Sequence, residues 1–172
     1  MVKARLQSDS EQAGDDERGE LHLGIDRVGV YPLRERDGYL VLSADGQYRS
    51  KIGVGPARVR QVAGSYSASA NLLTIVQYDE SPKGRRYVNS MWETQKDPYG
   101  GDVVNAYNDG PTEPGKPSLG GFYEIETSSP AAALAPGASL VHAHRTFHLM
   151  GERADLDAVA RRVLGVGLGE IH

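Results

Sequence analysis

Glycine and proline interrupt this chain so often that long regular elements have little room between them. The 172 residues include 21 glycines and 9 prolines, and both residue types disfavour helix interiors. Many segments between them are short and rich in β-branched and aromatic residues, which favour strands. Nine tyrosines stand against two phenylalanines and one tryptophan, and tyrosine suits a strand with one wet face. The sequence therefore predicts an all-β protein with many turns.

The strongest strand signal is the apolar, β-branched run over residues 72–78. Residues 39–43 and 48–52 flank an Asp45-Gly46 pair, which is typical of a hairpin turn, so we expect a hairpin there. Two stretches rich in glycine and proline, 95–102 and 108–120, are expected to be loops. The other segments expected to be extended are 58–63, 86–92, 121–127 and 139–149.

The period of the pattern becomes helical only near the carboxyl end. Between residues 154 and 164 the apolar side chains follow the i, i+3, i+4 spacing of a helix. Asp155 is a candidate N-cap, and Gly165 is expected to stop the helix. One short C-terminal helix is therefore predicted on an otherwise β domain.

Charge divides the chain into two parts. Residues 1–20 contain six acids and three bases, so they supply −3 of the net charge of −4. This composition predicts a disordered acidic tail over residues 1–20. It is followed by one domain over residues 21–172, which is long enough to bury a core without disulfides or metals.

Composition also excludes several classes of function. The chain lacks cysteine, which rules out thiolate zinc sites and cysteine nucleophiles. Mild acidity argues against nucleic-acid partners. Neither a membrane-spanning run nor the apolar core of a signal peptide is present. We therefore expect a cytoplasmic protein without membrane or nucleic-acid partners.

Three histidines lie in the expected strand over residues 139–149. Because strand side chains alternate with a period of two, His142, His144 and His148 share one face. Two imidazoles two residues apart can bind one metal ion, and the third is a further candidate ligand. The preferred interpretation gives these histidines a structural or sugar-facing role, with no metal and no cofactor. The alternative is a metal-dependent β-barrel enzyme that uses them as ligands.

Two glutamates alternate on one face of the expected strand over residues 121–127. A carboxylate that lines a cleft can act as a general base, so Glu124 and Glu126 are candidate catalytic residues. The alternative is that both are ordinary solvent-exposed acids.

Aromatic, amide and acidic residues gather between positions 89 and 109. An aromatic ring can stack on the C–H face of a sugar while amides and carboxylates bind its hydroxyls. The alternative is turn chemistry, because Asn-Asp-Gly-Pro at 108–111 is itself a turn signal. The candidate ligand-binding residues are Trp92, Asn89, Asn105, Tyr107, Asn108, Asp109, His142 and His144.

Five separated motifs follow one another along the chain. They are YRSKIGV (48–54), LLTIVQYD (72–79), NSMWETQKDPYGGDVVNAYNDGP (89–111), LGGFYEIETSSPAAALAPG (119–137) and HAHRTFH (142–148). With the closing LDAVARRVLGV segment, they resemble an uncharacterised bacterial family related to the galactose mutarotases (aldose 1-epimerases). The resemblance spans residues 22–166. It implies a galactose-mutarotase-like β-sandwich, present in part, with a sugar-shaped cleft.

The resemblance also implies a chemistry. In mutarotases a late-strand glutamate acts as base toward the anomeric hydroxyl, and a histidine from earlier in the chain protonates the ring oxygen. Glu126 best matches that glutamate, and Glu124 is the alternative. The only upstream histidine is His22, which lies in no recognisable motif. A carbohydrate-binding domain with aldose 1-epimerase activity is therefore expected, and a non-catalytic structural remnant is a further alternative.

The resemblance implies that the upstream part of a mutarotase-like domain is missing from this chain. A partial sandwich would expose apolar sheet surface and unpaired strand edges. We therefore expect a homo-oligomer or pairing with a missing N-terminal half. The expected ligand is a sugar or another small polar molecule.

Overall fold

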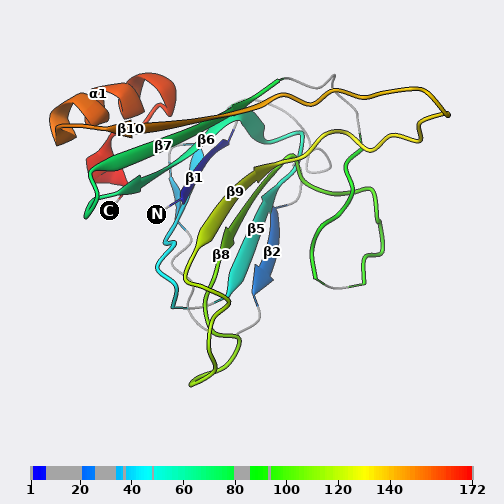
Figure 1. Cartoon of the computed structure of the whole chain (residues 1–172), viewed down its shortest axis with the longest axis horizontal. Coiled ribbons are helices and arrows are strands. Elements are labelled where there is room, and N and C mark those ends of the chain that lie inside the picture. Colours follow the sequence, from blue (N-terminus) through cyan, green and yellow to red (C-terminus); the bar gives the residue numbers. More distant parts are fainter. Residues whose placement is uncertain are drawn as a thin grey trace.

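The computed structural model describes residues 2–6, 21–25, 34–36, 38–47, 49–79, 86–92 and 94–171. Within these residues the chain is mostly β, with two antiparallel sheets, one α-helix and one short 3-10 helix (Figure 1). This architecture confirms the mostly β fold with one short C-terminal α-helix that the sequence predicts.

The larger sheet has six strands in the spatial order β10, β7, β6, β1, β4, β3. Val2–Leu6 forms β1, so these residues belong to the sheet rather than to the predicted tail, and residues 7–20 lie outside the described residues. The alternation of apolar and polar residues in VKARL is the strand signal that the charge count obscures. The bounds of the other strands are Arg34–Arg36 (β3), Tyr39–Leu42 (β4), Val59–Ser67 (β6), Leu72–Tyr78 (β7) and His144–Met150 (β10).

The smaller sheet has four strands in the order β2, β5, β8, β9. Their bounds are Leu21–Ile25, Ser50–Val54, Val104–Asn108 and Tyr123–Thr127. The hairpin predicted over residues 39–52 is wrong, because β4 and β5 belong to different sheets. Gly46 has the positive φ of 70° expected of the turn, but its N–H donates to Asn108 Oδ1 at 3.1 Å. The turn therefore carries the chain from one sheet to the other.

The two sheets pack against each other through apolar side chains. Alternate residues of β4, Leu40 and Leu42, form a buried cluster with Ile52, Val54 and Ala106 of the smaller sheet. A second buried cluster joins Ala63 and Tyr78 of the larger sheet to Tyr87, Val103 and Val104. One part of the apolar core therefore lies between the two sheets.

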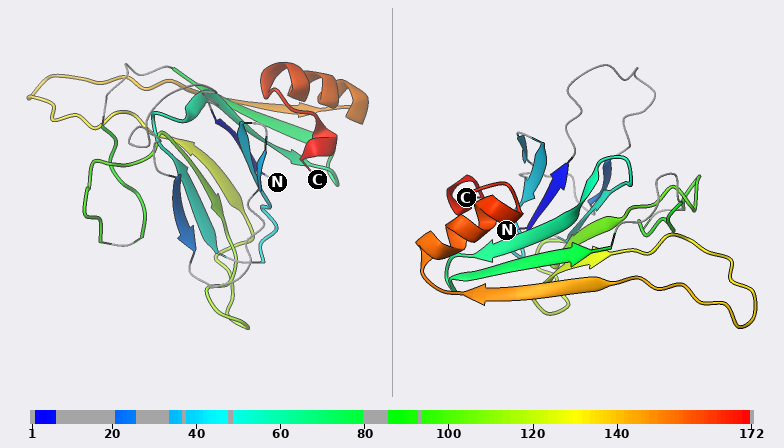
Figure 2. Two further views of the ribbon diagram at one scale, coloured as in Figure 1. Left: turned by 180° about the vertical axis from the view of Figure 1, so that it is seen from behind. Right: turned by 90° about the horizontal axis from the view of Figure 1, so that it is seen from above.

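Helix α1, Arg153–Val163, covers the opposite face of the larger sheet (Figures 1 and 2). Its N-cap is Glu152, so the predicted cap, Asp155, lies in the first turn instead. Gly165 follows the helix with a φ of 74°, which agrees with the predicted stop. The buried residues of this second core are Tyr39, Val41, Tyr66, Leu73, Ile75, Leu156, Ala160, Leu164, Val166, Leu168 and Ile171.

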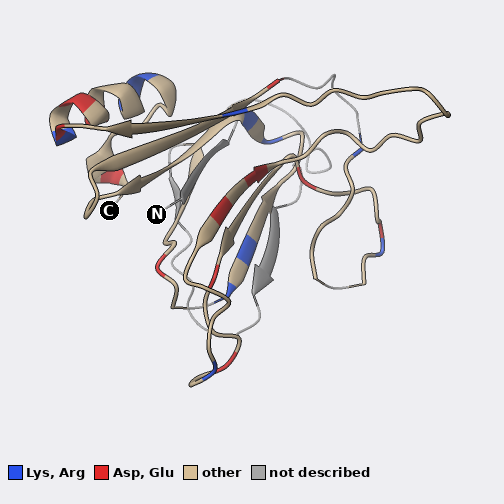
Figure 3. Cartoon of the chain, in the orientation of Figure 1, with Lys and Arg blue, Asp and Glu red and all other residues tan. Residues whose placement is uncertain are grey.

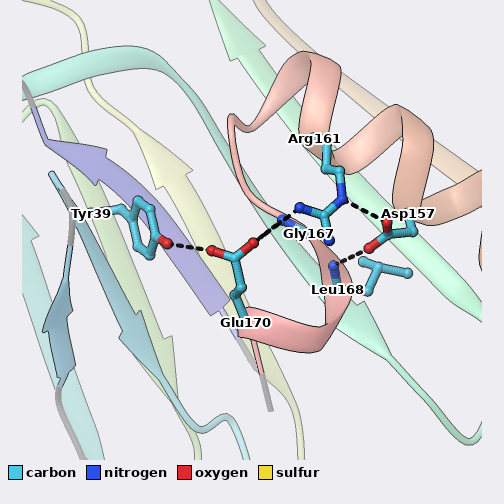
Figure 4. Close-up of polar contacts among 6 residues, drawn as sticks. All are labelled: Tyr39, Asp157, Arg161, Gly167, Leu168 and Glu170. Carbon is cyan, nitrogen blue, oxygen red and sulfur yellow. Dashed lines mark hydrogen bonds and ion pairs between the residues drawn. The ribbon is translucent and has the colours of Figure 1, made fainter.

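A polar network, here called the C-terminal clamp, ties α1 to the 3-10 helix η1, Leu168–Glu170, and to β4 (Figure 4). Arg161 donates to Asp157 Oδ2 at 2.8 Å and to Glu170 Oε1 at 3.2 Å. Glu170 also accepts a hydrogen bond of 2.8 Å from the Tyr39 hydroxyl. The Leu168 N–H donates to Asp157 Oδ1 at 2.6 Å. The hydrogen bonds from Arg161 and Leu168 hold the pKa of Asp157 below its ordinary value.

Between β9 and β10 the chain forms a long projection, here called the arm, residues 128–143. It extends beyond both sheets on the side away from α1 (Figures 1 and 2). Backbone hydrogen bonds of Ser128, Ala131 and Ala143 hold its base, and Ala138 N–H to Ala135 carbonyl closes its tip. The strand predicted over residues 139–149 therefore begins only at His144, since residues 139–143 belong to the arm.

Candidate functional site

Polar and aromatic side chains line the face of the smaller sheet that points away from the larger one. The register places Asn105 opposite Glu126 and Tyr107 opposite Glu124, so these four residues share a face. Ala106 between them packs toward the larger sheet. Figure 3 shows the acids of β9 and the base of β5 on either side of β8. We call this surface the outer face, formed by Lys51, Trp92, Asn105, Tyr107, Glu124 and Glu126.

Lys51 joins the strands of this face across β8. Its Nζ lies 3.7 Å from Glu126 Oε2 and donates to the Ser90 carbonyl at 3.4 Å. The Lys51 side chain is 11% exposed, whereas that of Glu126 is 48% exposed. The ammonium is therefore held against the sheet while the carboxylate reaches solvent. Sequence reasoning missed Lys51, although its alternation with Arg49 beside the turn indicates a shared strand face.

Trp92 packs over the centre of the outer face. Its ring meets Tyr107 edge-on, with 6.1 Å between the ring centroids, and the Arg49 guanidinium lies 4.3 Å from the indole centroid. Trp92 remains 39% exposed. Residues 86–92, which are expected to be extended, do not form a regular strand, because only an isolated bridge joins Tyr87 to Gly100. The indole is thus presented by a loop rather than by a strand.

Asp109 was a predicted hydroxyl-binding residue, but its carboxylate is fully buried and occupied. It accepts hydrogen bonds from the N–H groups of Gly120 at 2.8 Å and Gly121 at 2.9 Å. The Tyr107 hydroxyl at 3.0 Å and the Leu119 N–H at 3.3 Å complete its partners. Burial alone would raise the pKa of Asp109, but these four donors hold it below its ordinary value. Asp109 therefore closes the loop between β8 and β9.

Burial and the hydrogen bond to the Asp109 carboxylate together raise the pKa of the Tyr107 hydroxyl. The proton consequently stays on Tyr107, which donates it to Asp109 at 3.0 Å. On the outer face Tyr107 contributes its ring, which contacts Trp92 and also Phe122, at 5.7 Å between centroids.

The predicted asparagines also bind within the protein. Asn89 donates to Gln95 Oε1 at 2.7 Å and accepts from the Met91 N–H at 3.1 Å. Asn105 accepts from the Ser90 hydroxyl at 3.3 Å. Asn108 is buried and accepts from the Gly46 N–H. Asn89 and Asn108 thus hold loop and turn backbone in place, whereas Asn105 lies on the outer face within β8.

His142 and His144 contact the other side of β9. Thr127 Oγ1 is 2.8 Å from both His142 Nε2 and His144 Nδ1, and Thr127 follows Glu126 with the opposite orientation. His148 is separate, because its Nδ1 bonds to Thr74 Oγ1 at 3.0 Å. Among the residues that the structure describes, no three metal-binding side chains form a cluster that could hold an ion. The histidine trio is therefore not gathered into one centre.

The structure thus brings together Glu124, Glu126, Asn105, Tyr107 and Trp92 of the predicted set. His142 and His144 instead contact Thr127 on the other side of β9, and His148 contacts Thr74 of β7. Asn89, Asn108 and Asp109 serve the surrounding loops.

Comparison with known proteins supplies a family but no activity. The family described as "Family of unknown function (DUF6786)" matches residues 25–172, and the chain belongs to this family. No curated protein matches the chain, and neither does any solved structure. Across the described part of the chain, no helix has the length and apolarity that crossing a membrane requires.

Proposed function

We propose that this chain is a carbohydrate-binding domain of the galactose mutarotase type, in which the outer face binds the sugar. The observation that supports the proposal is that Trp92 packs on the sheet face that also carries Glu124 and Glu126. The indole contacts Tyr107, and Tyr107 is the register partner of Glu124. A partly exposed ring beside exposed acids suits a ligand with one apolar face and several hydroxyls.

The two kinds of contact have separate roles in binding. Arg49 covers one side of the Trp92 ring at 4.3 Å, so we propose that a pyranose stacks on the exposed part of the indole. The carboxylates of Glu124 and Glu126 accept hydrogen bonds from sugar hydroxyls, which are donors as well as acceptors. A charge-assisted hydrogen bond of this kind is stronger than one between neutral groups.

A proton-transfer role follows for the pair formed by Glu126 and Lys51. We propose that Glu126 removes the proton of the anomeric hydroxyl while the bond between the anomeric carbon and the ring oxygen breaks. The ring oxygen takes the electron pair and a proton from the Lys51 ammonium, which lies 3.7 Å from Glu126. Closure on the other face of the aldehyde reverses both transfers and restores both groups. Glu124 is the alternative base.

Binding is tested by the fluorescence of Trp92, which is the only tryptophan of the chain. Titration with glucose or galactose is expected to change the emission to a saturating value. Glu124→Gln and Glu126→Gln are expected to weaken the apparent affinity. Glu113→Gln is the matched control, because Glu113 is an exposed acid in the loop between β8 and β9. An emission that no sugar alters would contradict the proposal.

Catalysis is tested by polarimetry of freshly dissolved α-glucose or α-galactose. Glu126→Gln is expected to lower the protein-dependent rate by about 10²–10⁴-fold, as for the loss of a general base. Lys51→Met should lower it as well, while Glu113→Gln leaves it unchanged. If the rate with Glu126→Gln equals that of the unaltered protein, Glu126 is not the base. Sugar binding without any rate acceleration would leave a purely binding domain.

A further inference from the structure

The arm and strand β10, which follows it directly, expose several apolar side chains and carry few charged ones. Residues 128–143 contain no Asp, Glu, Lys or Arg, although 24% of the whole chain is charged. Its exposed apolar side chains are Leu134, Leu140 and Val141, which are 52%, 39% and 87% exposed. In β10, Phe147 and Met150 are 43% and 75% exposed. Figures 1 and 2 show the arm continuing the line of β10 beyond the sheet.

Strand β10 is also an open edge. Within the described residues it is the outermost strand of the larger sheet and pairs with β7 alone. Edge strands that avoid pairing usually carry charges, proline or a bulge. Across its seven residues, HRTFHLM, β10 has one charge, Arg145, and that side chain is bound to Asp79 at 2.8 Å. The edge therefore retains the features that permit a further strand to pair with it.

We infer that the partner for this surface is a second copy of the chain, with the two β10 strands paired antiparallel about a twofold axis. A register centred on Phe147 places Arg145 opposite Leu149 of the other copy and Thr146 opposite His148. No charged residue then faces a like charge, so no electrostatic repulsion opposes the pairing of two copies. A partner with a strongly charged strand would gain little, because the one charge of β10, on Arg145, is already bound to Asp79.

The same arrangement brings the arm of each copy against the other copy. In an antiparallel pair, the base of each arm runs beside the carboxyl end of the other copy's β10, where Met150 is exposed. Strand pairing by itself buries little area, whereas a stable interface requires roughly 1,000 Å² or more. The uncharged arm supplies the additional apolar surface. This inference does not depend on the carbohydrate proposal, because β10 and the outer face lie on different sheets.

The test is sedimentation velocity of the full chain over a concentration series. The unaltered protein is expected to shift from monomer to dimer. Phe147→Lys and Phe147→Glu are each expected to weaken dimerisation at least tenfold, because either puts two like charges together at the axis. An equimolar mixture of the two variants should recover the dimer, because opposite charges then meet. Leu119→Lys is the control, because Leu119 is also an exposed apolar residue, at 77%, but lies in the loop between β8 and β9.

Three results would overturn the inference. They are a protein that stays monomeric at every concentration, a Phe147→Lys dimer as strong as the original, and a dimer abolished by Leu119→Lys. Circular dichroism and thermal unfolding check that the variants fold. If the Phe147 variants do not, Val141→Lys replaces them, because Val141 is 87% exposed and its substitution is expected to weaken the dimer from the arm. A dimer unaffected by Val141→Lys would then contradict the inference that the arm and β10 together form the interface.

Discussion

The two sheets differ in how their far faces are completed. On the larger sheet, α1 covers Leu73 and Ile75, and Leu73 and Ala160 are fully buried where helix and sheet meet. On the smaller sheet the corresponding face carries the Lys51–Glu126 pair and a partly exposed Trp92. The same pleated backbone thus supports a closed apolar layer in one place and an open polar surface in the other. The closed face contributes to stability, and the open face is the one on which we propose that the sugar binds.

The largest expected effect is on the closed face. Leu73→Ala removes a fully buried side chain from the layer between sheet and helix. Lost burial and the resulting cavity are expected to lower the free energy of unfolding by about 2–5 kcal/mol, measured by urea titration. Leu119→Ala, at a position 77% exposed, should change it by less than about 0.5 kcal/mol. If the two substitutions lowered the free energy of unfolding equally, Leu73 would not lie in a buried layer between sheet and helix.

A smaller effect separates the two carboxylates of one hairpin. Asp109→Ala leaves three backbone N–H groups and the Tyr107 hydroxyl without their acceptor. We expect it to lower the free energy of unfolding by about 1–3 kcal/mol, because the buried Tyr107 hydroxyl loses its acceptor and the loop loses three further hydrogen bonds. Glu124→Ala on the exposed face should leave stability nearly unchanged while weakening sugar binding. If urea titration showed that Glu124→Ala destabilises the protein more than Asp109→Ala does, the structural role assigned to Asp109 would be wrong.

The smallest expected effect is the pH dependence contributed by the C-terminal clamp. The pKa of Asp157 is held below its ordinary value by the hydrogen bonds from Arg161 and Leu168. An acid with a lowered folded pKa stabilises the protein above its unfolded pKa, and this contribution disappears as the pH falls through the folded value. Asp157→Asn is therefore expected to lower the melting temperature at pH 7 and to flatten its decline below about pH 4. An unchanged pH profile would exclude Asp157 from that decline.

Local patterns predicted the elements whose signals lie within their own sequence. The β-branched run of residues 72–78 forms β7, and the helical spacing of residues 154–164 lies within or just beyond α1. Alternation in the segment 121–127 correctly indicated that Glu124 and Glu126 share a face. Each of these predictions depends on side chains a few positions apart, which is the range over which strand and helix periods operate.

Pairing between distant segments could not be predicted in the same way. Asp45-Gly46 is a turn signal, but turn chemistry does not specify that β4 and β5 enter different sheets. Likewise, the composition around Asp109 suggested a ligand, whereas its partners, residues 119–121, become neighbours only when β8 and β9 pair. Lys51 acquires its role from Glu126, 75 positions away in the chain and two strands away in the sheet.

The closure of the loop at Asp109 determines which way β9 presents its side chains. By holding residues 119–121, this carboxylate aligns Tyr123 with Asn108 and hence every later pair of the β8–β9 ladder. A slip of one residue would turn Glu124 and Glu126 inward, among the apolar residues between the sheets, and bring Ile125 to the surface. The chemistry available on one side of this sheet is thus governed by an acid at its end that never meets the solvent.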